Sequence, residues 1–312
     1  MTGGMQSEAS HRLTLVAQIQ PNRSNALVEA QFRAFYSRSL RARASSFTGV
    51  VMRRRMTTLF VSVLAAVLWG CAADTPISEV KGECSDAFGA EICAFARMQG
   101  ESVIEVGTIV PLASIEGTPA EIPMIMPMPP HAKVLIPEAA QAQAGLTEFT
   151  FYWEPGGHPP QTFMTPHFDF HFYLIPPAER EAIDCKDTSK PAELAAGYVL
   201  PDEQLPPDLA SMLGTDVLVG ICVPQMGMHS LLASEYEASE PFRGAMVIGY
   251  WKTKPIFLEP MISKAMLLEK KSFALPVPSV PGLTGAHPTT FRADYDEQAQ
   301  AYRFTWSGFT TT

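Results

Sequence analysis

The sequence has 312 residues, of which 46% are hydrophobic and 18% are charged, and it contains 27 prolines. A chain of this length forms one large domain or two small ones. The high apolar fraction excludes a disordered acidic chain, and the prolines exclude a helical bundle, because proline lacks the N–H that a helix interior needs. Residues 1–71 carry nine arginines against two glutamates, whereas the rest of the chain carries 14 basic and 30 acidic residues. The strongly acidic residues 72–312 exclude nucleic acid as a partner, because a protein that binds nucleic acid must neutralise the phosphates with lysine and arginine.

Residues 52–71 have the features of a bacterial export signal. A basic start at residues 52–56 (MRRRM) precedes a 12-residue apolar run from Thr57 to Leu68. Such a run forms a helix of about 18 Å, too short for a hydrocarbon core of about 30 Å, and the pattern is typical of a signal peptide. Gly70 and Cys71 resemble a lipobox, which predicts lipidation of Cys71; the alternative is ordinary cleavage a few residues later. We therefore expect an exported protein of the bacterial cell envelope, with a lipid anchor in the membrane.

Residues 1–51 precede this signal and are rich in arginine, serine and alanine. We interpret them as a spurious or disordered extension, with translation starting at Met52. Residues 72–81 are expected to form a tether, and residues 82–312 a single β-rich domain. A homo-oligomer is compatible with such a domain, although nothing in the sequence demonstrates one.

Four cysteines remain after Cys71, and an even number in an exported chain suggests disulfides. We predict a local bridge between Cys84 and Cys93 and a longer one between Cys185 and Cys222. Other pairings of the four cysteines, or four buried free thiols, are the alternatives.

The expected elements of the domain begin with a short helix over Cys84–Met98, whose apolar residues recur at helical spacing. From Ser102 onward the residues alternate in character, and proline or glycine interrupts the pattern roughly every 8–12 residues, which is typical of a sandwich or barrel. Helices are expected at 177–184 and 262–268, and further strands at 132–136, 147–153, 167–175, 217–223, 245–250, 256–258, 290–295 and 301–306. The predicted fold class is therefore mainly β: a single sandwich or barrel, cupin-like forms included, with a few short helices.

The densest chemical signal is PHFDFHFY at residues 166–173. In a strand, its three phenylalanines share one face and form core, while His167, Asp169, His171 and Tyr173 share the other. Imidazole and carboxylate are ligands of first-row metals. His167 and His171 would lie about 13 Å apart at roughly 3.3 Å per residue, so Asp169 can join one of them unless a bulge brings all three together.

Residues from other segments must complete such a site. The first choice is His229 after a glycine turn, and the second choices are His158 in a Gly/Pro loop and Glu259 at the end of an apolar strand. Two histidine-bearing strands joined by Gly/Pro loops resemble the metal site of cupins. We predict a divalent metal, Zn²⁺ foremost, with Mn, Fe or Cu as rivals. The alternatives are a buried hydrogen-bond network in a structural or interaction protein, and a cupin-like metal-dependent enzyme.

Six segments in order carry a wider resemblance. They are residues 153–160 (WEPGGHPP), 166–173 with 179–183 (EREAI), 224–229 (PQMGMH), 249–250 (GY), 257–261 (FLEPM), and 287–291 (HPTTF) with Tyr295. Together they resemble an uncharacterised family of exported bacterial β-proteins, often lipoproteins, whose signature is PHFDFHFY. The resemblance implies a β-rich fold and an envelope location, and it implies no reaction. From the candidate site itself we expect a role in binding or envelope stress rather than turnover.

Overall fold

The computed structural model describes residues 75–311, apart from residues 124, 126 and 239. The predicted extension, the signal peptide, the lipidation site Cys71 and the start of the predicted tether lie outside the described residues. Within the described part of the chain, no helix is long and apolar enough to cross a membrane.

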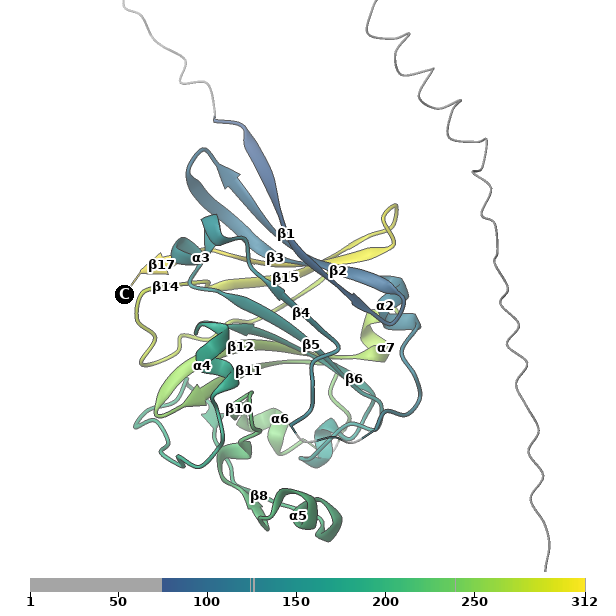
Figure 1. Ribbon diagram of the computed structural model, residues 1–312, viewed down its shortest axis with the longest axis vertical. Helices are drawn as coiled ribbons and strands as arrows, with labels where there is room; N and C mark the ends of the chain where they lie inside the picture. The colour runs from purple at the N-terminus through teal and green to yellow at the C-terminus, as the bar shows by residue number, and fades with distance from the viewer. Residues whose placement is uncertain (1–74, 124, 126, 239, 312) are drawn as a thin grey trace, which may run out of the picture. The chain divides into compact units, whose positions relative to one another are not determined.

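Two antiparallel sheets make up the body of the domain (Figure 1). The six-stranded sheet has the order β1 (Ile77–Ala87), β2 (Ala90–Gln99), β3 (Ser102–Pro111), β16 (Ala301–Ser307), β15 (Thr290–Asp296), β13 (Phe273–Leu275). The seven-stranded sheet has the order β4 (Ala132–Leu135), β5 (Glu148–Glu154), β6 (His167–Tyr173), β12 (Lys254–Ser263), β11 (Gly244–Trp251), β10 (Met228–Leu232), β7 (Tyr198–Val199). Two short pairs are separate from these sheets: β14 (Ala286–His287) with β17 (Thr310–Thr311), and β8 (Glu203–Gln204) with β9 (Val217–Leu218).

The two sheets pack face to face through aromatic side chains. The ring centroids of Phe170 in β6 and Phe304 in β16 lie 4.5 Å apart, and those of Phe172 and Trp306 lie 5.4 Å apart. All four side chains are fully buried, and burying each such side chain stabilises the fold by about 1.5–3 kcal/mol. The predicted mainly β fold is confirmed and is a sandwich, and the phenylalanine face of β6 is core as expected.

Short helices connect the strands. They are α2 (Leu112–Glu116), α3 (Glu138–Ala144), α4 (Pro177–Glu181), α5 (Pro207–Leu213), α6 (Ala233–Tyr236) and α7 (Lys264–Leu267), with 3₁₀ turns η1 (Gln161–Phe163) and η2 (Val219–Ile221). Helices α4 and α7 confirm the two expected helices, in shorter form.

The helix expected over Cys84–Met98 is wrong, because this segment is a β-hairpin made by β1 and β2. Phe88 and Gly89 form its two-residue turn, and both have positive φ, which suits the twist of paired strands. Both faces of β2 carry buried apolar side chains, including Ile92 and Phe95. The resulting mixed pattern has no clean period of two and resembles a helical one.

Three expected boundaries also differ. The predicted tether 72–81 overlaps β1, which begins at Ile77. The single strand expected at 217–223 is the short strand β9 followed by η2, interrupted at Gly220 with a φ of 64°. The apolar strand expected to end at Glu259 continues through Pro260 to Ser263, because β12 pairs with neighbours on both sides. Glu259 therefore lies within a central strand.

Both predicted disulfides are present. Cys84 and Cys93 join β1 to β2, and Cys185 and Cys222 join the segment after α4 to the end of η2. Two disulfides are compatible with an extracytoplasmic location, because oxidising compartments preserve them.

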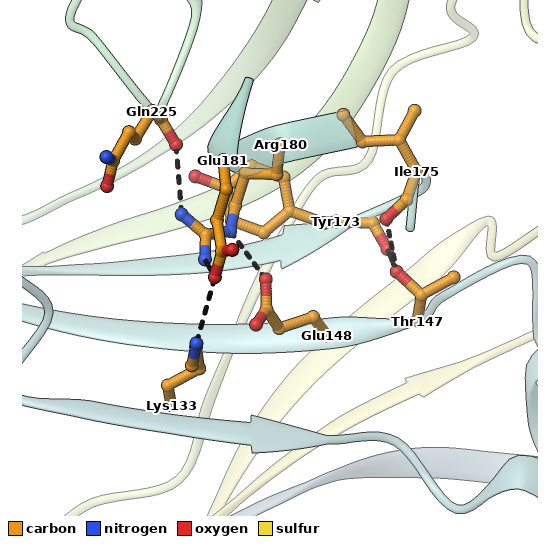
Figure 2. A network of polar contacts seen from close by, with 8 residues as sticks. All are labelled: Lys133, Thr147, Glu148, Tyr173, Ile175, Arg180, Glu181 and Gln225. Atoms are coloured by element: carbon orange, nitrogen blue, oxygen red, sulfur yellow. Dashed lines mark hydrogen bonds and ion pairs between the residues drawn. The ribbon is translucent and has the colours of Figure 1, made fainter. Parts of the chain in front are cut away.

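A buried ion pair attaches α4 to the seven-stranded sheet. Arg180 Nε donates to Glu148 of β5 over 2.6 Å, and both side chains are buried. Figure 2 shows Arg180 also reaching Glu181 and the Gln225 carbonyl oxygen, while Lys133 binds Glu181 from the solvent side. The guanidinium therefore connects α4, β5 and the turn before β10.

Candidate metal centre

One face of the seven-stranded sheet carries the residues predicted for the site. Every residue of β6 is buried; its phenylalanines pack toward the other sheet, so His167, Asp169 and His171 point the opposite way. Antiparallel pairing places Glu154 of β5 opposite His167, and Met261 of β12 opposite Asp169. The polar face of β6 is thus flanked by two strands.

Three of the predicted residues form a first cluster, here called the outer triad: His158, His167 and Asp169. His158 comes from the loop after β5, and its Nε2 lies 3.8 Å from Asp169 Oδ2. His167 Nε2 lies 3.2 Å from Asp169 Oδ1. His167 and Asp169 are buried, while the side chain of His158 is 37% exposed.

The other three form a second cluster, here called the inner triad: His171, His229 and Glu259. His171 Nε2 lies 3.5 Å from Glu259 Oε2, and His229 Nε2 lies 3.9 Å from the same oxygen. The carboxylate is supplied by β12, which pairs with β6, and His229 by β10, beyond β11. His171 and Glu259 are buried, and the side chain of His229 is 14% exposed.

Backbone carbonyls orient three of the four imidazoles. Nδ1 of His158 lies 2.8 Å from the carbonyl oxygen of the next residue, and Nδ1 of His167 lies 2.7 Å from that of the residue two before it. Nδ1 of His229 lies 2.9 Å from the carbonyl oxygen of Ile221. Because a carbonyl only accepts, each Nδ1 carries the proton and donates it. In a neutral ring such as that of His229, the lone pair of Nε2 then faces a carboxylate, an orientation that metal-binding histidines commonly have.

The facing atoms of the inner triad are unsatisfied. Within the described part of the chain, the two ring nitrogens of His171 have no hydrogen-bond partner, and Oε2 of Glu259 has none either. Burial, then the charge of Asp169, raises the pKa of Glu259 well above its usual value. Burial is also the main cause that lowers the pKa of His171 to about 3 and that of His229 to about 4. Two neutral imidazoles do not compensate the charge of a buried carboxylate, so its ionised form requires another cation.

The outer triad is electrostatically different. Burial opposes a charge on His158, but Asp169 and Glu154 outweigh it and raise the pKa of His158 to about 9. Burial likewise opposes a charge on Asp169, but His167 and His158 outweigh it and hold the pKa of Asp169 well below its usual value. This triad therefore contains its own ion pair.

The spacing within each triad fits a divalent metal. Each triad offers three ligand atoms that lie within 4.8 Å of one another. Ligands at about 2.0–2.2 Å from a tetrahedral zinc ion are about 3.3–3.6 Å apart, so the 3.5 Å between His171 and Glu259 already fits and the 3.9 Å between His229 and Glu259 must shorten by a few tenths of an ångström. Three protein ligands leave a fourth position open. Cys84, Glu91 and Cys93 also lie close together, but both cysteines are oxidised in their disulfide.

A glycine makes room for the phenylalanine ring that packs against both imidazoles of the inner triad. The Phe257 centroid lies 4.7 Å from that of His171 and 5.1 Å from that of His229. A Cβ at Gly249, which is paired with Phe257 across the β11–β12 ladder, would lie 2.0 Å from this ring. Only a residue without a side chain leaves room for Phe257 here.

All six predicted ligands lie on one face of the sheet, but they form two clusters rather than one. His167 and His171 belong to different triads, as the length of a strand predicts. His158 and Glu259, the second choices, complete the triads together with His229. The structure has no bulge that brings His167, Asp169 and His171 onto one ion.

Three residues beside the triads were not among the predicted ones. Gly249 carries no chemical signal of its own, and only its pairing with Phe257 shows its importance. Burial, then Asp169, raises the pKa of Glu154 to about 7. Glu154 follows directly after the predicted strand 147–153, and continuing the period-two spacing from Tyr152 by one step could have identified it as a residue of the polar face. The third residue, Thr150, lies opposite His171 on the neighbouring strand β5.

Comparisons of this chain with protein-family models, with curated proteins and with solved structures find no match. The family resemblance of the sequence therefore stays a prediction, and the functional argument depends on the site itself.

Proposed function

We propose that this protein is a metal-binding protein of the bacterial cell envelope, anchored by a lipid at Cys71, with one divalent ion held by the inner triad. The observation that carries the proposal is the approach of His171 Nε2 and His229 Nε2 to one buried oxygen of Glu259, at 3.5 and 3.9 Å. A divalent ion satisfies all three atoms at once and compensates the buried carboxylate.

Zn²⁺ is the ion that these ligands suit best. Two imidazoles and one carboxylate are a common zinc ligand set, and the open fourth position accepts water or a ligand group. Mn, Fe and Cu are the rivals, because imidazole and carboxylate also bind them. Binding or an envelope-stress role follows more directly from such a site than turnover does. The two disulfides support the proposed location.

The outer triad favours a second function, that of a structural ion-pair network. His158 and Asp169 compensate each other's charge, and two of the three residues are buried. We propose that this triad holds the loop after β5 against the sheet.

Elemental analysis by mass spectrometry tests the assignment. The full chain, produced in bacteria without a polyhistidine tag, should contain about one metal ion per molecule. His171→Ala, His229→Ala and Glu259→Gln should lose the ion, and His167→Ala should retain it. His287→Ala is the matched control, because His287 is also buried and its Nδ1 also bonds a carbonyl, that of Gly285.

Two results would contradict the proposal. Loss of the ion in His167→Ala with retention in His171→Ala would move the site to the outer triad. Wild-type protein that stays metal-free after incubation with Zn²⁺, Cu²⁺ and Mn²⁺ would make both triads structural networks.

A further inference from the structure

An apolar cavity of about 410 Å³ lies over the polar face of the seven-stranded sheet. Its walls come from the loop after β5, the β8–α5–β9 segment, η2 and four residues before β4, namely Ile122, Pro123, Ile125 and Met128; Figure 1 shows β8 and α5 side by side. The β8–α5–β9 segment contributes four leucines: Leu205, Leu209, Leu213 and Leu218. The volume falls within the roughly 300–1,000 Å³ typical of small-molecule sites.

The polar groups of this cavity gather at the sheet. Glu154, His158, Asp169 and His229 line it there, and Glu203 of β8 lines it as well. Its described lining contains no lysine or arginine. An anionic ligand would therefore find no fixed cation apart from His158, which Asp169 already compensates.

One carboxylate oxygen at this end lacks a donor. In the described part of the chain, Oε1 of Glu154 is buried and has no hydrogen-bond partner, and the neighbouring Asp169 has one oxygen 3.2 Å from His167 Nε2. Asp169 itself is 5% exposed. Unsatisfied buried acceptors are costly, and an ammonium group carries three donors and no acceptor.

We propose that this cavity binds an apolar organic amine, with its ammonium group at Glu154 and Asp169 and its hydrocarbon body among the leucines. The ammonium end at Glu154 and Asp169 contains no inner-triad ligand, although His229 lines the same cavity, so the proposal does not depend on the proposed function. The cavity volume equals that of about fourteen water molecules at roughly 30 Å³ each. An eight-carbon chain fits it and displaces water from apolar walls, which is favourable.

Isothermal titration calorimetry with three probes of equal chain length tests this proposal: n-octylamine, n-octanol and n-octanoate. The full chain is titrated both after chelator treatment and after loading with zinc. Octylamine should bind at least tenfold more tightly than octanol, and octanoate more weakly than both. Glu154→Gln should weaken octylamine about tenfold and leave octanol unchanged.

Two further variants complete the design. Glu179→Gln, which changes an exposed glutamate of α4, is the matched control and should bind as wild type does. Leu218→Trp should fill the cavity and weaken the binding of every probe that the wild-type protein binds. Thermal unfolding of each variant verifies that it is folded.

Several outcomes would overturn the proposal: no binding of octylamine, octanoate binding at least as tightly, or an unchanged affinity in Glu154→Gln. Competition between zinc and octylamine would also overturn the proposal, because the cation bound at Glu154 and Asp169 would then be a metal ion. If the protein binds octylamine but takes up no metal, the amine site is supported and the proposed metal-binding function fails. If it binds zinc but not octylamine, the metal-binding function is supported and the amine site fails.

Discussion

Among the single residues of the site, Gly249 and Phe257 hold the inner triad in place without donating a ligand. The Phe257 ring lies against both imidazoles and occupies the space that a side chain at Gly249 would need. Side chains that orient ligands affect metal affinity almost as strongly as the ligands do. The aromatic ring is thus part of the site.

We predict that Gly249→Ala lowers zinc affinity by about 10-fold or more, because the new Cβ displaces Phe257 toward the imidazoles. Overpacking of this kind also destabilises by about 1–3 kcal/mol. The measurement is competition with a chromogenic zinc chelator. Gly156→Ala is the control, since a Cβ there meets nothing within 4 Å. Equal zinc affinity in the two variants would show that Phe257 does not orient the ligands.

Among the elements, α4 is short and depends on its buried contact with β5. Arg180 is 2% exposed and its partner Glu148 is 1% exposed, so removal of either charge leaves the other buried. A helix of this length has little stability of its own. The position of α4 is therefore determined by the ion pair.

We predict that Arg180→Met destabilises the domain by about 3–5 kcal/mol, because Glu148 is left as an uncompensated buried carboxylate. Urea unfolding followed by tryptophan fluorescence measures the change. Lys133→Met removes the exposed pair with Glu181 instead and should cost less than about 1 kcal/mol. A small effect of Arg180→Met would mean that water or another group satisfies Glu148.

The elements also show what local sequence can predict. Alternation along β6 is local, so the phenylalanine face, the polar face and the separation of His167 from His171 followed from the sequence. The pairing of β6 with β12 joins residues far apart in the chain, and it alone places Glu259 beside His171. The sequence pattern over Cys84–Met98 predicts a helix instead of the β1–β2 hairpin, because both faces of β2 are partly buried and the alternation that identifies a strand is lost.

Across the whole molecule, the two disulfides serve different regions. Cys84–Cys93 joins two strands of the six-stranded sheet, whereas the strands that carry the triads belong to the seven-stranded sheet. Cys185–Cys222 closes the segment that contains Ile221, whose carbonyl oxygen orients His229. This second bridge therefore supports a metal ligand.

We predict that replacing Cys185 and Cys222 together with serine lowers zinc affinity by about 10-fold, because the Ile221 carbonyl no longer fixes His229. Loss of the bridge also costs about 2–4 kcal/mol of stability. The matched control replaces Cys84 and Cys93 with serine and should leave zinc affinity unchanged. Chelator competition on both proteins gives the answer, and equal losses would contradict a specific role for the second bridge.

The position of Cys222 next to Ile221 gives the maturation of the protein an order. A newly made chain in a reducing cytoplasm lacks the bridge, so one histidine of the inner triad would not yet be held in its binding orientation. On the proposed function, ion uptake would follow oxidation, and oxidation would follow export. The nascent chain would then bind zinc about tenfold more weakly in the cytoplasm than the oxidised protein binds it in the envelope.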